Sequence, residues 1–188
     1  SGTVTGLAVG GLPDGTVDDG TVASGIASSK LTGALPAISG ASLTGFTDAQ
    51  MPAGSVLQVI HAQSTGAVST TSTSNWADTT CTAAITPSST SSKVMILMAH
   101  HSIDSSTTAS DADIRLLRGS TNIKDVTKYM GESLEGNFNM SCADCYLDSP
   151  NTTSATTYKT QIKIGDGSGT VAVNVYVPSS ITLMEIAG

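Results

Sequence analysis

The chain has 188 residues, enough for one ordinary domain and a smaller additional element, and its net charge is −7. Acidic and basic residues are spread along it without a basic stripe, which argues against nucleic acid or an anionic membrane surface as a partner. No apolar run approaches the roughly 18 residues that a membrane span needs, so we expect no membrane insertion.

The first part of the chain, residues 1–53, consists of short repeats punctuated by glycine. Leu31-Thr32-Gly33 returns as Leu43-Thr44-Gly45, and Asp14-Gly15-Thr16-Val17 returns as Asp19-Gly20-Thr21-Val22. Units with one or two small apolar residues cannot close a core within one chain and become stable by stacking or winding with other copies. We therefore predict an extended, glycine-rich trimeric shaft here. Since the chain begins at Ser1 without a methionine, we also expect its natural N-terminus to be missing.

A linker follows at residues 47–54, where Pro and Gly punctuate the sequence and the composition changes. The second part, residues 54–188, holds the single Trp and all four Tyr, and only this part has the large side chains that dominate a core. We therefore divide the chain into a shaft and trimerisation segment, 1–53, and a head domain, 54–188.

The head contains about nine short strand candidates separated by turn residues, a spacing typical of an antiparallel β-sandwich with a jelly-roll-like order. The candidate strands are 56–63, 79–85, 93–101, 113–118, 122–126, 142–147, 156–164, 171–177 and 181–186. The polar tracts 65–74, 102–110 and 128–139 are predicted to be its long loops. The protein is therefore expected to be all-β.

The apolar positions of these strands predict the core of the head. The predicted core residues are Leu57, Val59, Ile85, Val94, Ile96, Met98, Ile114, Leu116, Val173, Val175, Leu183 and Ile186. Trp76, next to the second strand candidate, is expected in the core or at a trimer interface.

Cys142 and Cys145 have the spacing of a redox pair or of half a zinc site, with Cys81, His61 and the pair His100-His101 as further possible ligands. On a strand, positions three apart lie on opposite faces, so a disulfide or shared metal would require a bulge. We predict buried, unreacted thiols, with zinc or redox chemistry as the alternative.

His100 and His101 end the most apolar strand, so one imidazole should point inward and the other outward. We expect a hydrogen-bonded or solvent-facing histidine there, while an inward His near a three-fold axis could hold a metal ion. Residues 111–113 and 166–169 resemble calcium loops only faintly, and we interpret both as turns. We predict no metal site and no cofactor.

Catalytic motifs are also lacking: no G-x-S-x-G elbow occurs, and Gly165–Gly169 lacks the helix and Lys of a phosphate-binding loop. A pair of carboxylates for glycoside cleavage is defined by distance in three dimensions and stays open at this stage. The sequence therefore favours a protein that is not an enzyme.

Several segments, in this order, resemble the linker repeats and C-terminal heads of bacteriophage tail-fibre and other virion proteins. These segments are residues 29–46, 85–94, 115–121, 146–150 with 153–159, and 179–186. The resemblance implies a homotrimeric fibre tip on a virion, outside the cell, attached to upstream tail-fibre or virion proteins. It implies receptor binding by the head to a host-surface glycan or protein, and it carries over no catalytic residues. The Cys142–Cys145 motif departs from this pattern.

Two other classes are alternatives. A tail-associated glycan depolymerase usually needs a long groove, and 188 residues leave no room for one in each chain. A secreted C1q/TNF-like trimeric adhesin is the third possibility.

Receptor contact is expected on the long head loops, because loops on a rigid scaffold commonly display binding residues. The loop Lys128–Asn139 combines aromatic, carboxylate and amide groups that suit the ring face and hydroxyls of a saccharide. Its candidate receptor-binding residues are Tyr129, Glu132, Glu135, Asn137 and Phe138. In the alternative interpretation, Tyr129 and Phe138 fold inward and anchor the loop.

Overall fold

The computed structural model describes residues 47, 50–105, 110–131 and 138–188. The chain divides into two units, Ser1–Gly45 and Phe46–Gly188, and every described residue belongs to the second. The first unit, with almost all of the predicted shaft, lies outside the described residues.

The described part of the chain contains ten β-strands and no α-helix, and each strand pairing is antiparallel. The strands are β1 (Val56–Ser64), β2 (Val68–Thr70), β3 (Ala77–Ile85), β4 (Lys93–Ser105), β5 (Ser110–Arg118), β6 (Thr121–Met130), β7 (Phe138–Asp148), β8 (Thr156–Gly167), β9 (Val171–Val173) and β10 (Ser179–Ile186).

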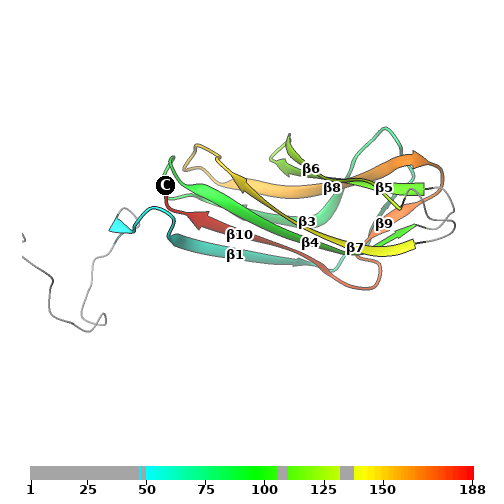
Figure 1. Ribbon diagram of the computed structural model, residues 1–188, viewed down its shortest axis with the longest axis horizontal. Helices are drawn as coiled ribbons and strands as arrows, with labels where there is room; N and C mark the ends of the chain where they lie inside the picture. The colour runs from blue at the N-terminus through cyan, green and yellow to red at the C-terminus, as the bar shows by residue number, and fades with distance from the viewer. Residues whose placement is uncertain (1–46, 48–49, 106–109, 132–137) are drawn as a thin grey trace, which may run out of the picture. The chain divides into compact units, whose positions relative to one another are not determined.

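These strands form two sheets, which Figure 1 shows packed against each other. The six-stranded sheet has the order β1-β10-β4-β9-β2, and β7 also pairs with β4. The four-stranded sheet has the order β3-β8-β5-β6. The prediction of an antiparallel β-sandwich is confirmed.

Strand β3 illustrates why these residues form strands. Cys81, Ala83 and Ile85 are buried, whereas Thr82 and Ala84 between them are exposed. This alternation has the two-residue period of a strand with one face on a core and one face in solvent. The strand ends at Ile85, before the predicted breaker sequence that begins with Thr86-Pro87.

The core lies between the sheets in two clusters that each draw side chains from both sheets. The first contains Cys81, Ala83, Ile85, Val94, Ile96, Met98, Leu116, Tyr158, Ile181 and Leu183. The second contains Ile103, Ala112, Ile114, Phe138, Ile162, Ile164, Val171 and Val173. Eight of the twelve predicted core residues lie in these clusters. Of the others, Leu57, Val175 and Ile186 are half-buried, and Val59 is 53% exposed.

The prediction for β1 was wrong because its two faces are nearly equally apolar. Ile60 and Ala62 pack against the first core cluster, and Val59 points away from it. A bulge between Val56 and Gln58 interrupts the pairing of β1 with β10 and sets which face turns inward.

The inward position of Gln58 is explained by Glu185, a fully buried carboxylate on β10. Gln58 Nε2 donates a hydrogen bond of 2.6 Å to one oxygen, and the Ser88 N–H and hydroxyl each donate one of 2.7 Å to the other. Burial by itself would raise the pKa of Glu185, but the hydrogen bonds from Gln58 and Ser88 outweigh it and lower that pKa. The sandwich therefore holds a charged carboxylate at this end of its core.

A second buried polar contact joins the two sheets. The Tyr158 hydroxyl on β8 donates to Asp148 on β7 at 2.7 Å, and Arg118 on β5 pairs with the same carboxylate at 2.9 Å. Burial raises the pKa of Tyr158, and the hydrogen bond to Asp148 raises it further. The phenol stays protonated and ties the end of β7 to the opposite sheet.

The predicted loops are shorter in the structure than in the sequence analysis. Residues 65–74 include β2, and 102–110 contribute to the end of β4 and the start of β5. Likewise, Lys128–Met130 complete β6, and Phe138 and Asn139 begin β7. Strand pairing depends on backbone hydrogen bonds, so it continues through these polar residues beyond the apolar part of each strand.

Candidate functional site

The outward face of the four-stranded sheet carries a network of charged and aromatic side chains around Trp76. The Arg115 guanidinium lies 4.2 Å from the centroid of the Trp76 ring, and the Lys163 ammonium lies 5.4 Å from it. Such cation–π contacts fix both partners. Trp76 is half-buried and belongs to neither core cluster, so the expectation of a core position was wrong.

Arg115 is held in place by a chain of polar contacts across the sheet. Its guanidinium donates two hydrogen bonds, of 2.8 and 2.6 Å, to the Gln161 side chain. Gln161 in turn donates to Asp78 at 2.6 Å, and Lys159 pairs with Asp78 at 2.7 Å. The hydrogen bonds from Lys159 and then Gln161 lower the pKa of Asp78, so this carboxylate stays charged.

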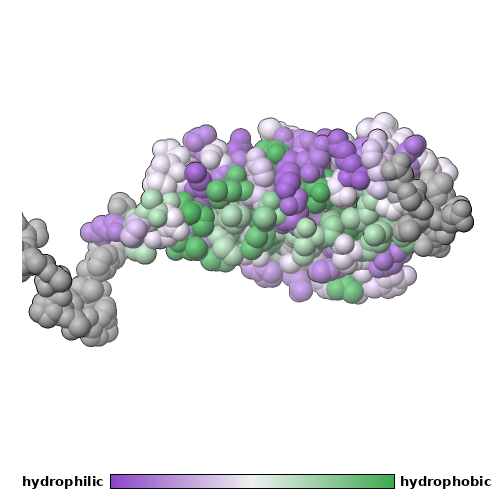
Figure 2. All heavy atoms as spheres, in the orientation of Figure 1, coloured by the Kyte–Doolittle hydropathy of each residue, from purple (hydrophilic) through white to green (hydrophobic). Residues whose placement is uncertain are grey.

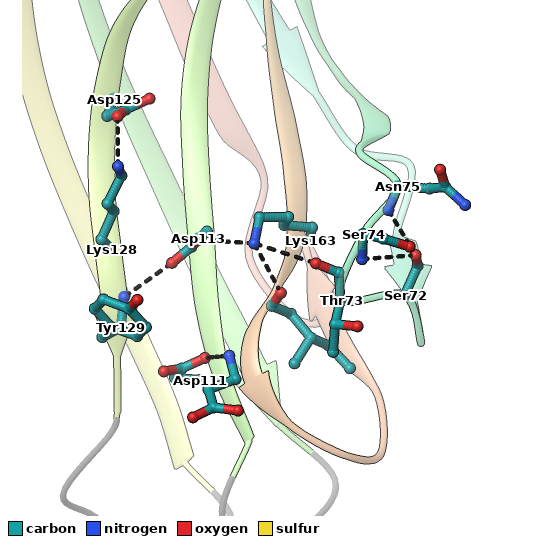
Figure 3. Close-up of polar contacts among 12 residues, drawn as sticks. Ser72, Thr73, Ser74, Asn75, Asp111, Asp113, Asp125, Lys128, Tyr129 and Lys163 are labelled. Atoms are coloured by element: carbon teal, nitrogen blue, oxygen red, sulfur yellow. Dashed lines mark hydrogen bonds and ion pairs between the residues drawn. The ribbon is translucent and has the colours of Figure 1, made fainter.

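The network continues from Lys163 to Tyr129, as Figure 3 shows. Lys163 pairs with Asp113 at 3.1 Å, and the Tyr129 backbone N–H donates to the other Asp113 oxygen at 2.9 Å. Tyr129 has a φ of 55°, in the left-handed region that a side chain such as Tyr rarely adopts. Its side chain is 50% exposed. The Asp113 carboxylate therefore holds the backbone in a conformation that displays the tyrosine.

The structure separates the five predicted receptor-binding residues. Tyr129 is displayed on the surface, whereas Phe138 is only 5% exposed and packs in the second core cluster. The Phe138 ring contacts Gly131, which has a φ of 92° and no side chain to collide with the ring. Phe138 thus anchors the segment from within. Glu132, Glu135 and Asn137 lie outside the described residues.

Sequence reasoning missed Arg115 and Lys163 as partners of Trp76. The alternation of β8 places Lys159, Gln161 and Lys163 on one face, and this signal was available. The pairing of β8 with β5 brings Arg115 opposite Gln161, and no local pattern announces that pairing.

Asp111 and Asp166 come together, although the sequence analysis interpreted their segments as separate turns. Asp111 lies in β5, not in a turn, and its carboxylate accepts a hydrogen bond from the Asp166 N–H. Burial raises the pKa of Asp111, and the charges of Asp113 and Asp166 add to the effect. In the part of the chain that the structure describes, no group of three or more His, Cys, Asp or Glu side chains could hold a metal ion.

The cysteines are free thiols, and Cys142 and Cys145 lie on opposite faces of β7 as their spacing predicted. Burial raises the pKa values of Cys81 and Cys142 to about 11. Cys145 is exposed, which corrects the prediction that all these thiols are buried.

The two adjacent histidines also point to opposite faces, as predicted. His100 is fully buried, and neither ring nitrogen has a hydrogen-bond partner among the described residues. This differs from the expected hydrogen-bonded or solvent-facing imidazole. His101 is half-buried, with its Nδ1 3.3 Å from the Ser141 hydroxyl.

The network combines two aromatic rings, of which one is covered by cations and the other is accessible to a partner. Arg115 and Lys163 occupy the π system of Trp76, whereas Tyr129 offers a half-exposed ring and a hydroxyl. An exposed tyrosine can pack on an apolar surface and donate or accept a hydrogen bond at its tip. This arrangement suits binding to a partner that presents both apolar faces and polar groups.

The chain matches no family model and no curated protein. Among solved structures, it is similar to the crystal structure of the VP2 subviral particle of infectious bursal disease virus. The sequence identity is 14%, the TM-score is 0.33, and the match covers 70% of this chain and 38% of that chain. A TM-score this low carries no argument about function. Within the described residues, no helical segment has the length and hydrophobicity of a membrane span.

Proposed function

We propose that the chain is a non-catalytic structural and receptor-binding part of a bacteriophage tail fibre. In this proposal, residues 1–53 form a shaft that assembles three copies, and the β-sandwich at the virion's fibre tip contacts a host-surface glycan or protein. The support comes from the ordered segments that resemble phage fibre proteins and from a sandwich of the expected kind. Upstream tail-fibre or virion proteins would hold the other end of the shaft.

The observation that carries receptor binding is the display of Tyr129. A half-exposed tyrosine in a left-handed conformation carries a conformational cost that the Asp113 hydrogen bond offsets. Backbone strain of this kind clusters at active sites, ligand clamps and switch regions. Lys163 fixes Asp113 in turn, so the ring is presented by a rigid sheet face.

The test is binding of the full chain to an array of purified bacterial lipopolysaccharides and capsular polysaccharides. We expect Tyr129→Ala to lower the affinity for the glycan that binds best by at least tenfold and Tyr129→Phe to lower it less. Tyr176→Ala is the matched control, because Tyr176 is an exposed tyrosine, 75% accessible, between β9 and β10. Equal binding by Tyr129→Ala and the parent chain would remove Tyr129 from the receptor site.

The same array distinguishes a binding protein from a depolymerase. New reducing ends released from any polysaccharide on incubation with the chain would contradict the non-catalytic assignment. Binding without such release is the expected result.

A further inference from the structure

We propose that the outward face of the four-stranded sheet binds an acidic saccharide, with Arg115 holding a carboxylate or phosphate group of the glycan. The inference rests on the glycan binding in the proposed function, and it names the chemical class of that glycan. Two observations carry it, the pairing of charges on this face and the open edge of one guanidinium group.

The lysines of this face are each paired with an aspartate. The pairs are Lys159–Asp78 at 2.7 Å, Lys163–Asp113 at 3.1 Å and Lys128–Asp125 at 2.8 Å. Figure 3 shows the pairs of Lys163 and Lys128. Each of these carboxylates has a cation of its own, so the six charges largely cancel one another.

Arg115 lies among these pairs and forms no ion pair within the described residues. In the register of the sheet, Asp78 on β3 lies opposite Gln161 on β8, Gln161 opposite Arg115 on β5, and Arg115 opposite Asp125 on β6. Asp111, a further carboxylate of β5, lies four positions from Arg115, about 13 Å along the strand. One positive charge therefore remains unpaired at the centre of this face.

The guanidinium of Arg115 is held in place with one edge left open. Its Cζ lies 4.2 Å from the centroid of the Trp76 ring, and its Nε and Nη2 donate to Gln161 Oε1 at 2.8 and 2.6 Å. Nη1 has no hydrogen-bond partner among the described residues, and it is not one of the buried polar atoms without a partner. Nη1 and the outer N–H of Nη2 thus present two parallel donors, which match two oxygens of a carboxylate or phosphate.

An arginine held in this way binds an anion at low entropic cost. A free arginine side chain loses rotamer freedom when it binds, whereas Trp76 and Gln161 already order Arg115 in the unbound protein. The indole also covers one face of the half-buried guanidinium and keeps water away from it, which strengthens its attraction for an anion at the open edge.

Arg115 lies close to Tyr129, the displayed residue of the proposed receptor site. Arg115 and Asp113 are two positions apart on β5 and share a face, and the Tyr129 N–H on β6 donates to Asp113. Two positions along a strand and one strand across correspond to roughly 8 Å between backbones. A sugar ring that packs on Tyr129 can therefore place an acidic group of the same or the next sugar unit at Arg115.

The preference for an acidic glycan is a local property of this face. The chain has a net charge of −7, so its overall field repels polyanions. Figure 2 shows hydrophilic residues gathered along the upper part of the view, where Figure 1 places β6, β8 and β5. One unpaired arginine suits isolated acidic groups along a glycan, and it does not suit the continuous phosphate backbone of a nucleic acid.

The test uses the full chain and the array of bacterial polysaccharides in three forms. Each polysaccharide is untreated, reduced at its carboxyl groups to alcohols, or freed of its phosphates. We expect the parent chain to bind best to an acidic polysaccharide and one of the two treatments to lower that affinity at least tenfold. The effective treatment identifies the bound group as a carboxylate or a phosphate.

Arg115→Gln removes the charge and the paired donors. We expect it to lower the affinity for the untreated acidic polysaccharide at least tenfold and to leave the affinity for the treated form unchanged. Arg115→Lys keeps the charge without the paired donors, and we expect at least a threefold loss. Lys93→Gln is the matched control, because Lys93 is exposed on β4 of the other sheet and forms no ion pair within the described residues. It should bind like the parent chain, and far-ultraviolet circular dichroism establishes that the variants keep the fold.

Best binding to a neutral polysaccharide, or equal binding to all three forms, would overturn this proposal and leave glycan binding in the proposed function intact. An acidic preference that Arg115→Gln retains would also overturn it, because the anion would then bind elsewhere. If Arg115→Gln does not fold, Arg115→Lys decides the assignment, and unchanged binding by that variant would overturn it. No binding to any polysaccharide of the array would overturn the receptor role and this inference together.

Discussion

The buried imidazole of His100 should make the stability of the sandwich depend on pH. Burial lowers the pKa of His100 from 6.5 to about 4, and the neighbouring His101 contributes to the decrease. Between pH 6.5 and 4, the unfolded chain binds a proton at this residue and the native protein does not. The free energy of unfolding therefore falls as the pH decreases through this window, and it is fully recovered above pH 6.5.

The size of the effect follows from the two pKa values. The loss is about 1.4 kcal/mol per pH unit within the window, which amounts to about 2 kcal/mol at pH 5 relative to pH 8. Replacing His100 by Leu removes the titrating group at nearly constant volume. It also removes two buried nitrogens without partners among the described residues, each of which costs about 1 kcal/mol or more. We therefore expect His100→Leu to be at least as stable as the parent at pH 8.

The assay is urea unfolding of the parent and His100→Leu at pH 8, 7, 6 and 5, followed by the fluorescence of Trp76, the single tryptophan. Both proteins are measured at one concentration, because assembly contributes to apparent stability. Subtracting the two curves removes contributions that both proteins share, such as that of Asp111. The free energy of unfolding of His100→Leu minus that of the parent should grow by about 2 kcal/mol from pH 8 to pH 5. Parallel pH curves would refute the assignment of a neutral, buried imidazole.

Two further predictions concern the core and the anchor at the end of β6. Ile96→Asp places an unpaired charge in a fully buried position and should unfold the domain. The control Ala84→Asp, at an exposed strand position, should keep a β-type circular dichroism spectrum. A folded Ile96→Asp would contradict the assigned core. Gly131→Ala should lower the urea midpoint by more than Gly119→Ala, because both have positive φ but only an added Cβ at Gly131 would collide with Phe138. We expect about 1 kcal/mol of destabilisation for Gly119→Ala and at least twice that for Gly131→Ala, and equal losses would mean that backbone strain alone sets the cost.

Much of the sandwich was predictable because its strands carry strong local patterns. In β3, small and apolar residues alternate with exposed ones, and the Pro-containing breaker marks the end of the strand. In β4, the inward positions Val94, Ile96 and Met98 are all apolar, so their burial did not depend on knowing the partner strands. Period-two alternation reports directly on which side chains can share a face.

The candidate site was predictable only in part. Tyr129 was identified because it lies in a polar tract with an aromatic residue, but its display depends on the hydrogen bond that its backbone N–H donates to Asp113, sixteen positions away in the sequence. Phe138 has the same local character, and the structure places it in the core instead. Composition identifies a segment with binding chemistry, whereas the direction of each ring is set by the residues packed around it.

The sequence alone determined the strand content, the antiparallel sandwich and most of the core, since these depend on local periodicity. The tertiary structure decided which face of β1 turns inward. This strand is apolar on both sides, so its sequence is consistent with either face on the core. In the fold, the buried Glu185 accepts a hydrogen bond from Gln58, and this contact places the face of Gln58 inward. It also decided that Trp76 lies beneath Arg115 and Lys163. Such juxtapositions arise from pairing between strands that are distant in the chain, and no local pattern encodes that pairing.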